Sequence, residues 1–124
     1  MEYKHSILII EDENNIRNFI TALLEANNYQ IITAESCSSG QMMFNSYRPD
    51  LIILDLGLPD KDGTEFIRYV RSENSTPIIV LSARTDEKDK VEALDLGAND
   101  YVTKPFGSAE LVARIRSALR STRV

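Results

Sequence analysis

Four short strand-like segments of the sequence are each followed by side chains that can take part in metal or phosphoryl chemistry. Glu11 and Asp12 follow the first segment, and Asp55 directly follows another. Ser82 follows a third, and Lys104 follows the last. If the segments are strands of one parallel sheet, their carboxyl ends share an edge, where ligands bind in open sheets of this kind. The sequence therefore predicts that carboxylates, a hydroxyl and an ammonium group lie together.

The chemistry of this set indicates phosphoryl transfer with a divalent cation. Three carboxylates supply the oxygen ligands that suit Mg²⁺, whereas without a cation they would repel one another. Lys104 can neutralise phosphoryl charge from the other side, and the Ser82 hydroxyl can donate to a phosphoryl oxygen. Asp55 is then the candidate nucleophile, which would form an acyl phosphate.

Each of these residues also has an ordinary structural explanation. An acid after a strand is commonly a helix cap or a solvated turn residue. Ser82 alone could be a turn residue before a helix. Tyr101, which lies in the last strand-like segment before Lys104, could likewise be an ordinary aromatic residue of an edge strand. Four strand ends that match one chemistry favour a functional site over these separate explanations.

The segments that must position these residues alternate between strand and helix patterns. Strands are expected at 6–10, 29–34, 51–54, 78–81 and 100–103, and helices at 14–26, 36–47, 64–71, 86–96 and 108–120. The third and fourth strands are apolar at every position, so both of their faces should be buried. The alternation predicts an α/β fold, and right-handed crossovers favour a doubly wound five-stranded parallel sheet. Asn14 and Thr85 are the expected N-caps of two helices, and Gly97 is an expected helix stop.

Length and composition indicate one globular domain. The chain has 124 residues, of which 43% are hydrophobic and 27% charged. Apolar runs such as Ile7 to Ile10 are far shorter than the roughly 20 residues that span a bilayer, so no membrane segment is expected. Nineteen acids and fourteen bases give a net charge of −5, which argues against binding nucleic acid or an anionic membrane through the overall field.

The expected location is the cytoplasm. The first residues lead straight into a strand pattern, so no secretory signal is expected. The single cysteine, Cys37, cannot form a disulfide within the chain, and a lone thiol suits a reducing compartment.

Along essentially its whole length the chain resembles the receiver domain of two-component response regulators. The motifs that carry the resemblance are Glu11-Asp12, Leu54-Asp55-Leu56-Gly57-Leu58-Pro59-Asp60, Ser82-Ala83 and Lys104-Pro105-Phe106. The resemblance implies a flavodoxin-like (βα)5 fold with strand order 2-1-3-4-5. It also implies a receiver domain over residues 1–120, with 121–124 as the start of a linker.

The resemblance implies roles for the site residues. Asp55 would accept a phosphoryl group from the phosphohistidine of a sensor histidine kinase. The chain would thus catalyse its own phosphorylation and dephosphorylation rather than act as an enzyme on another substrate. Mg²⁺ would be held by Glu11, Asp12, Asp55 and the backbone carbonyl of Gly57. Receivers often have Asp-Asp at the first pair, and Glu-Asp is a common variant.

Further roles follow from the same resemblance. Ser82 and Lys104 would grip the phosphoryl group, and the Lys104–Pro105 peptide bond would be cis. Gly57 and Arg84 would flank the path of the water that removes the phosphoryl group, with Gly57 leaving the path open and Arg84 modulating it.

A narrower resemblance concerns a subfamily. Asp100-Tyr101, Lys104-Pro105-Phe106, Leu58-Pro59-Asp60 and Gly63 resemble receivers of transcription factors with a C-terminal winged-helix DNA-binding domain. Within these, the stretch around Asp55 is most similar to regulators of high-affinity potassium uptake. Promoter DNA would be contacted only through a C-terminal domain that these 124 residues do not include, so the chain would be an excised receiver or a stand-alone one.

The resemblance also implies a switch that controls dimerisation. Phosphorylation would swing the Ser82 hydroxyl toward the phosphoryl group and let Tyr101 turn inward. The segments 86–96, 100–103 and 108–120 would then form a two-fold interface.

Charged residues are expected to pair across this interface. Lys90 would meet Glu110 of the second copy, and Asp100 would meet Arg114. Asp95 would meet an arginine late in the last helix. The apolar anchors are expected at Val91, Leu94, Leu111 and Ala113. The alternative is a solvated helix face, with Glu110 and Arg114 as an i,i+4 pair within one helix.

Three rival interpretations remain open. The stretch 60–64 matches the Asp-x-Asp-Gly-Thr signature of haloacid-dehalogenase-type phosphatases, but Pro59 rather than a buried strand precedes it. A flavin module would need a phosphate loop after the first strand, where three acids would instead repel phosphate. The third rival is an interaction module that is not phosphorylated. The stretch 60–64 also fails as an EF-hand, because its glycine has the wrong offset. Replacing Asp55 by Asn separates the interpretations.

Overall fold

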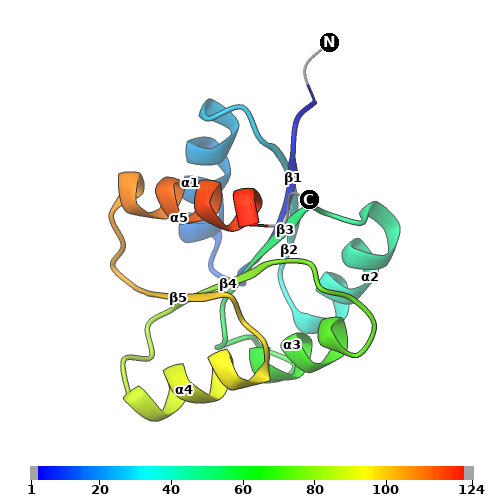
Figure 1. Ribbon diagram of the computed structural model, residues 1–124, viewed down its shortest axis with the longest axis vertical. Helices are drawn as coiled ribbons and strands as arrows, with labels where there is room; N and C mark the ends of the chain where they lie inside the picture. Colours follow the sequence, from blue (N-terminus) through cyan, green and yellow to red (C-terminus); the bar gives the residue numbers. More distant parts are fainter. Residues whose placement is uncertain (1–2, 122–124) are drawn as a thin grey trace.

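The computed structural model describes residues 3–121, in which five parallel strands form one sheet with the order β2-β1-β3-β4-β5. The strands are β1 (Ser6–Ile10), β2 (Gln30–Ala34), β3 (Leu51–Leu54), β4 (Ile78–Ser82) and β5 (Asp100–Thr103). The helices are α1 (Asn14–Ala26), α2 (Cys37–Tyr47), α3 (Gly63–Arg71), α4 (Glu87–Leu96) and α5 (Ser108–Ser121). The predicted doubly wound fold and its strand order are confirmed (Figure 1).

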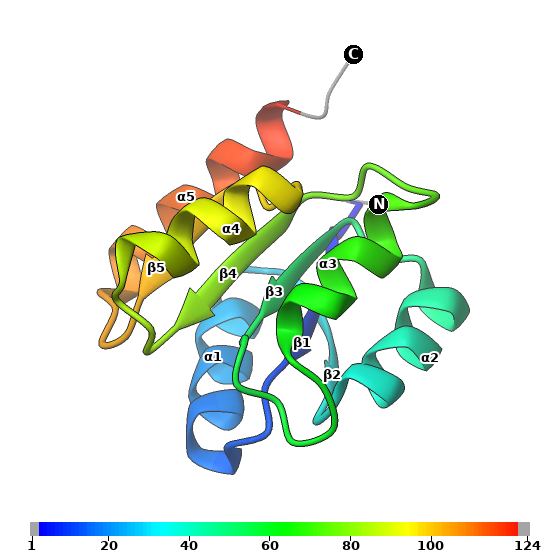
Figure 2. The ribbon, with the colours of Figure 1, turned by 90° about the horizontal axis from the view of Figure 1, so that it is seen from below.

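The sheet is covered by helices on both faces, as its apolar strands require. Helices α2, α3 and α4 pack on one face, and α1 and α5 pack on the other (Figures 1 and 2). Successive side chains of a strand point to opposite faces, so Leu8 joins the first core and Ile7 the second. Every residue of β3 and β4 is buried, because each of these strands has neighbours on both sides and helices on both faces.

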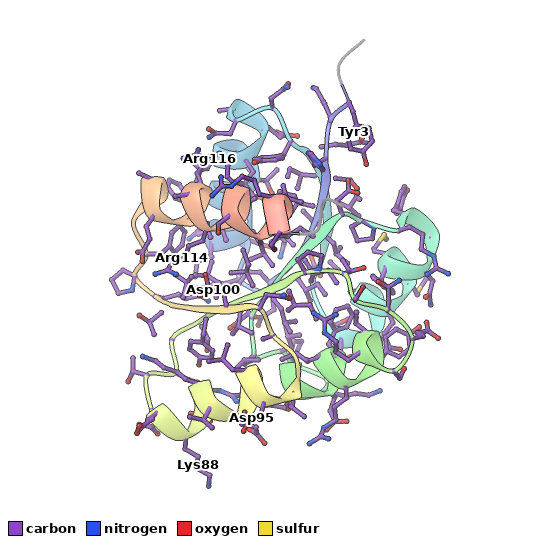
Figure 3. The ribbon with its side chains drawn as sticks, in the orientation of Figure 1. Tyr3, Lys88, Asp95, Asp100, Arg114 and Arg116 are labelled. Carbon is purple, nitrogen blue, oxygen red and sulfur yellow. The ribbon has the colours of Figure 1, made fainter. Side chains whose placement is uncertain are left out.

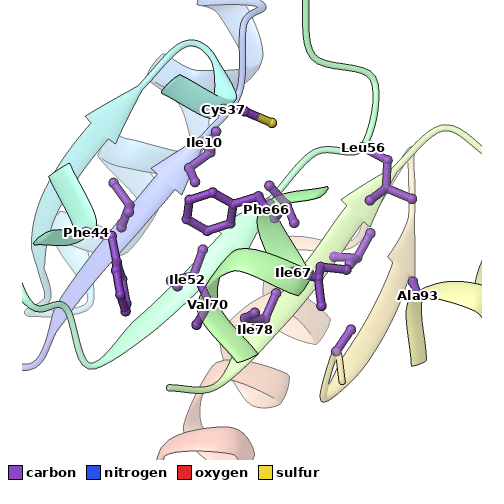
Figure 4. Packing of buried hydrophobic residues seen from close by; sticks show 14 of the residues in the cluster. Ile10, Cys37, Phe44, Ile52, Leu56, Phe66, Ile67, Val70, Ile78 and Ala93 are labelled. Atoms are coloured by element: carbon purple, nitrogen blue, oxygen red, sulfur yellow. The ribbon is translucent and has the colours of Figure 1, made fainter. Parts of the chain in front are cut away.

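Aromatic packing fills the core under α2 and α3. Phe44 and Phe66 are fully buried, with ring centroids 6.4 Å apart in an edge-to-face arrangement (Figure 4). Burying a side chain of this size stabilises the fold by about 1.5–3 kcal/mol relative to exposure. The fully buried Cys37 lies in the same core, which agrees with a packing role for the only thiol.

Several predicted helix ends are shifted. Asn14 is the first residue of α1 rather than its cap, and Asp86 rather than Thr85 precedes α4. Ser36 caps α2 with a reciprocal hydrogen-bonded box to Ser39, and Gly97 ends α4 at φ 119°, as expected. Helix α5 continues to Ser121, one residue into the predicted linker, whose remainder, 122–124, lies outside the described residues. Within 3–121, every helix is too short or too polar to cross a membrane.

Backbone hydrogen bonds continue the sheet pairing beyond the strand ends. The amide of Glu11 donates to the carbonyl of Ala34, and the amide of Asp55 donates to that of Ile10, each at 3.0 Å. The amide of Lys104 donates to the carbonyl of Ser82 at 2.9 Å. The residues at the carboxyl edge are therefore held by the sheet itself. They lie at the point where the chain order reverses between β1 and β3, which is the usual ligand-binding position in such sheets.

Candidate functional site

Three acids predicted from the ends of two strands meet at the carboxyl edge of the sheet. Glu11, Asp12 and Asp55 each place a carboxylate oxygen within 4.8 Å of the others. Glu11 and Asp55 are buried, at 2% and 7% exposure, whereas Asp12 is exposed. The cluster thus has a protein-facing side and a solvent-facing side.

Lys104 supplies the positive charge of the site from the end of β5. Its ammonium group lies 2.9 Å from Oε1 of Glu11 and 3.7 Å from Oδ2 of Asp55. The Lys104–Pro105 peptide bond is cis, as expected. The site therefore joins residues that are far apart in the sequence, and it brings together the acids and the lysine that the strand ends predicted.

The electrostatics of Glu11 reflect its burial. Loss of contact with water raises the pKa of its carboxyl group above the ordinary value, and the nearby Asp55 charge adds to this. Hydrogen bonds from Lys104 and from the backbone amide of Glu13 oppose the shift without cancelling it. The protein's own groups thus do not fully offset the cost of burying the charged form of Glu11.

The donor set fits a hard divalent cation. Three carboxyl groups face a single ammonium group, so the cluster offers only oxygen ligands and an excess of negative charge. Mg²⁺ prefers oxygen ligands, retains several waters and needs only one or two carboxylates, which suits a cluster that is open to solvent at Asp12.

Ser82 and Tyr101 are linked through one residue of the connection between β4 and α4. Ser82 is buried, and its Oγ accepts a hydrogen bond from the backbone amide of Arg84 at 3.1 Å. The hydroxyl of Tyr101 donates to the backbone carbonyl of Arg84 at 2.9 Å. The half-buried Tyr101 ring packs against the core under α2, α3 and α4, so it is already turned inward.

Gly57 in the loop between β3 and α3 and Gly63 at the start of α3 have very different surroundings. A Cβ atom at Gly63 would lie 2.6 Å from the carbonyl oxygen of Asp55 and 2.7 Å from Cα of Leu56, so only glycine fits there. A Cβ atom at Gly57 would meet nothing within 4 Å. The sequence analysis used Gly63 only as part of a motif that carries the subfamily resemblance, and it missed this contact, because no local pattern encodes it.

The aspartates of the phosphatase-like signature cap helices instead of joining the acid cluster. Asp60 accepts hydrogen bonds from the amides of Cys37 and Ser38 at the start of α2, at 2.9 and 3.0 Å. These bonds lower the pKa of Asp60 to about 2. Asp62 caps α3 by accepting from the amide of Thr64, and it forms an ion pair with Arg84. The geometry therefore disfavours the phosphatase interpretation.

The charged face formed by α4, β5 and α5 differs in part from the expectation. Arg114 lies 3.0 Å from Asp100 of the same chain, and both residues are labelled in Figure 3. Arg114 also lies 2.9 Å from Glu110 of the same chain. The Asp100–Arg114 pair expected between two copies thus forms within one, and the i,i+4 alternative for Glu110 is confirmed. Lys88 and Asp95 are both exposed on α4.

The apolar residues of this face divide into two groups. Val91 and Leu94 on α4 are 49% and 45% exposed, and Ala113 is also exposed, so each is available to a partner. The expectation that Leu111 anchors an interface is wrong in this conformation. Its side chain is fully buried in the core between the sheet and helices α1 and α5.

A hollow of about 380 Å³ adjoins the acid cluster on the side of α1. Its lining consists of Ile16, Phe19, Lys104, Pro105 and Phe106. Phe19 is 51% exposed, and its ring centroid lies 6.0 Å from that of Phe106. Lys104 lines the hollow and also contacts Glu11 and Asp55, so the hollow lies directly beside the acid cluster.

Comparisons with known proteins agree with this geometry. Residues 7–116 match the family described as "Response regulator receiver domain". The chain is 53% identical over 115 residues to the KDP operon transcriptional regulatory protein KdpE of Escherichia coli (strain K12), covering 93% of this chain and 51% of that protein. It is 44% identical over 117 residues to the phosphate regulon transcriptional regulatory protein PhoB of the same strain, covering 92% and 51%. The chain thus spans about half the length of these relatives.

Solved structures show the same fold. A two-component response regulator from Clostridium difficile matches with a TM-score of 0.94 at 26% identity, covering 98% of this chain and 100% of that one. The BeF3-activated N-terminal receiver domain of RstA from Klebsiella pneumoniae matches with a TM-score of 0.90 at 30% identity, covering 93% and 98%.

Proposed function

The chain belongs to the response regulator receiver domain family, and from that premise we propose that Asp55 accepts a phosphoryl group from the phosphohistidine of a sensor histidine kinase. One observation carries this proposal. The buried Asp55 carboxylate lies beside two further acids and within 3.7 Å of the Lys104 ammonium group, at the ligand-binding edge of the sheet.

The proposed reaction is a displacement at phosphorus. A carboxylate oxygen of Asp55 forms a bond to the phosphorus atom while the bond between phosphorus and the donor imidazole nitrogen breaks, so the imidazole leaves with that electron pair. Lys104 stabilises the negative charge of the transferring group, and Ser82 orients it by donating its hydroxyl hydrogen. Glu11, Asp12, Asp55 and the carbonyl of Gly57 would hold Mg²⁺, which neutralises phosphoryl charge when bound. Hydrolysis of the same acyl phosphate would reverse the signal.

The kinase is proposed to dock on the hollow between α1 and the segment after β5. A phosphohistidine carried on a folded kinase domain must approach Asp55 from solvent, and this apolar surface borders Lys104. Phe19 is the exposed aromatic of the hollow, and such residues commonly anchor protein interfaces.

The proposed output is dimerisation through α4, β5 and α5. Val91, Leu94 and Ala113 offer exposed apolar surface there, and Lys90 and Glu110 would pair between copies. Asp100 and Glu110 both already pair with Arg114 within the chain, so these residues would have to exchange or share partners on association.

The proposed cellular context follows from the relatives. Residues 1–120 would form the receiver of a longer transcription regulator in the cytoplasm, with promoter DNA bound by a further domain. Similarity to the KDP operon regulator supports the potassium-uptake subfamily that the sequence indicates.

Intact-protein mass spectrometry after incubation with Mg²⁺ and acetyl phosphate tests the proposal. We expect a labile gain of one phosphoryl group that is lost in Asp55→Asn and kept in the matched variant Asp60→Asn. Size-exclusion chromatography of the same samples should show a shift to a dimer. No gain, or a gain that survives in Asp55→Asn, would reject Asp55 as the acceptor and favour an interaction module. A gain lost only in Asp60→Asn would favour the phosphatase interpretation.

A further inference from the structure

Arg84 contacts the phosphoacceptor loop, the site hydroxyl and the inward aromatic residue at the same time. Its guanidinium pairs with Oδ1 of Asp62, and the same nitrogen lies 3.4 Å from the carbonyl oxygen of Leu56. Its backbone amide donates to Ser82 at 3.1 Å, and its backbone carbonyl accepts from Tyr101 at 2.9 Å. A single residue therefore joins the loop after Asp55 to the face formed by α4, β5 and α5.

The connection that contains Arg84 depends on such contacts for its position. Residues 83–86 lie between β4 and α4 and belong to neither element, although the carbonyl of Asp86 accepts the first hydrogen bonds of α4, from the amides of Asp89 and Lys90. The side chain of Arg84 reaches across to the loop between β3 and α3, which the close approach at Gly63 holds to the backbone of Asp55. The Arg84–Asp62 ion pair thus attaches a segment without regular structure to a constrained one.

Arg84 and Asp62 each shift the pKa of the other in the direction that favours the charged form. The hydrogen bond to Asp62 holds the pKa of the Arg84 guanidinium above its usual value, against the effect of burial. Burial would raise the pKa of Asp62, but hydrogen bonds from Thr64 and Arg84 hold it below its usual value. Both side chains are partly exposed, at 35% and 39%, so salt can weaken the pair.

We propose that the Arg84–Asp62 ion pair is a positioning device that keeps residues 83–86 against the phosphoacceptor loop and thereby holds Tyr101 inward before any phosphorylation. If the pair breaks, the connection is released, and the carbonyl that accepts the Tyr101 hydroxyl moves away with it. The Ser82 hydroxyl accepts from the Arg84 amide, and its one hydrogen can still be donated, either to the oxygen of Tyr101 or to a phosphoryl oxygen. The pair is therefore compatible with the phosphoryl-bound state and biases the chain toward it, a consequence that rests on the proposed function.

The test follows the orientation of Tyr101 in the unphosphorylated chain. The protein is labelled with 3-fluorotyrosine, and the ¹⁹F signal of Tyr101 is assigned by its absence in Tyr101→Phe. Arg84→Met and Asp62→Asn each remove the ion pair, and asparagine preserves the cap of α3. Asp89→Asn is the control, because Asp89 acts on both Arg84 and Tyr101 only through its charge.

We expect each single variant to raise the outward population of Tyr101 about two- to fivefold. This range corresponds to the small stabilisation that partly exposed ion pairs commonly give. The double variant should add little to the larger single effect, because both changes break the same contact. High salt should act on the wild-type signal in the same direction and leave Asp62→Asn nearly unchanged.

Other outcomes would overturn the inference. A ¹⁹F signal that is the same in wild type, Arg84→Met and Asp62→Asn would show that the pair does not position Tyr101. An equal shift in Asp89→Asn would assign the effect to general charge rather than to the contact. Mass spectrometry of the same proteins with acetyl phosphate decides the proposed function separately, since the ¹⁹F measurement needs no phosphoryl group.

Discussion

The ammonium group of Lys104 donates a hydrogen bond to Oε1 of Glu11 at 2.9 Å, across 93 positions of the sequence. This bond ties the end of β5 to the end of β1 over the acid cluster. Lys104 lies 3.7 Å from Asp55, so in this conformation its stronger contact is with Glu11. A phosphoryl group on Asp55 would therefore have to compete with Glu11 for the lysine.

Replacing Lys104 by Met should destabilise the protein in a pH-dependent way. The change leaves the buried Glu11 without its cation, and we expect the free energy of unfolding at pH 7 to fall by about 2 kcal/mol. The pKa of Glu11 is already raised and would rise further. A raised carboxyl pKa favours folding only at low pH, and this contribution is lost as the pH rises through the folded-state value. Urea unfolding at pH 7 and pH 5 should therefore show the smaller loss at pH 5.

A double variant provides the control for this prediction. Glu11→Gln in the Lys104→Met background should recover most of the stability at pH 7, because no uncompensated carboxylate remains. A loss of equal size at both pH values would argue that packing of the lysine stem, rather than charge, is what Lys104 contributes.

Adding Mg²⁺ should stabilise the protein through the acid cluster. At a concentration ten times the dissociation constant, we expect a gain of about 1.4 kcal/mol, because the ion binds the folded state. Asp12→Asn should weaken binding, whereas Asp60→Asn, whose carboxylate caps α2, should not. Both effects can be measured by thermal unfolding without Mg²⁺, with Mg²⁺, and again after a chelator has removed the Mg²⁺. Equal Mg²⁺ responses in the two variants would contradict the assignment of the metal site.

Gly63 at the start of α3 and Gly57 in the loop before it should differ in how much their substitution affects stability. Gly63→Ala should destabilise the protein by about 1–3 kcal/mol, because its Cβ atom would collide with the backbone of Asp55 and Leu56. Gly57→Leu should leave the unfolding midpoint nearly unchanged, since the space beside it is open. If Gly57 leaves a path for the attacking water, the leucine variant should hold its phosphoryl group several times longer, as followed by mass spectrometry. An unchanged lifetime would reject that role for Gly57.

Asp60 should contribute to stability only above strongly acidic pH. Hydrogen bonds from the amides of Cys37 and Ser38 lower its pKa to about 2. A depressed carboxyl pKa stabilises the fold above the unfolded-state value, near 4, and this contribution is lost as the pH falls toward 2. Asp60→Asn should therefore unfold at a lower urea concentration than wild type at pH 7, and the difference should narrow between pH 4 and pH 2. A difference that is constant with pH would show that the charge is not responsible.

Phe19→Ala should separate kinase recognition from chemistry. Its side chain is half-exposed in the hollow beside Lys104, so removing it should lower the free energy of unfolding by only about 1 kcal/mol. We expect phosphoryl transfer from a sensor kinase to slow about tenfold, while phosphorylation by acetyl phosphate stays at the wild-type rate. Ala22→Ser, another exposed change on α1, is the matched control. Equal slowing with both donors would place Phe19 in the site rather than on a docking surface.

The order of the elements and the composition of the site follow from local patterns in the sequence. The strands 51–54 and 78–81 are apolar at every position, and this alone requires helices on both faces of a parallel sheet. Once the strands are parallel, Glu11, Asp55 and Lys104 must share an edge, so the chemistry could be inferred before any contact was known. Errors at this level were confined to the ends of elements, such as the expected caps Asn14 and Thr85 and single-residue shifts of the strands at 29–34 and 78–81.

Other features depend on distances between segments that no local pattern encodes. The roles of Asp60 at the start of α2 and of Gly63 against Asp55 arise only when the loop after β3 is placed in space. The same holds for Leu111, which α5 turns into the core. It also holds for the pairing of Arg84 with Asp62, because side chains 22 positions apart meet only through the packing of two loops. Periodicity thus determined which residues face the core or the sheet edge, while tertiary packing decided which polar side chains touch.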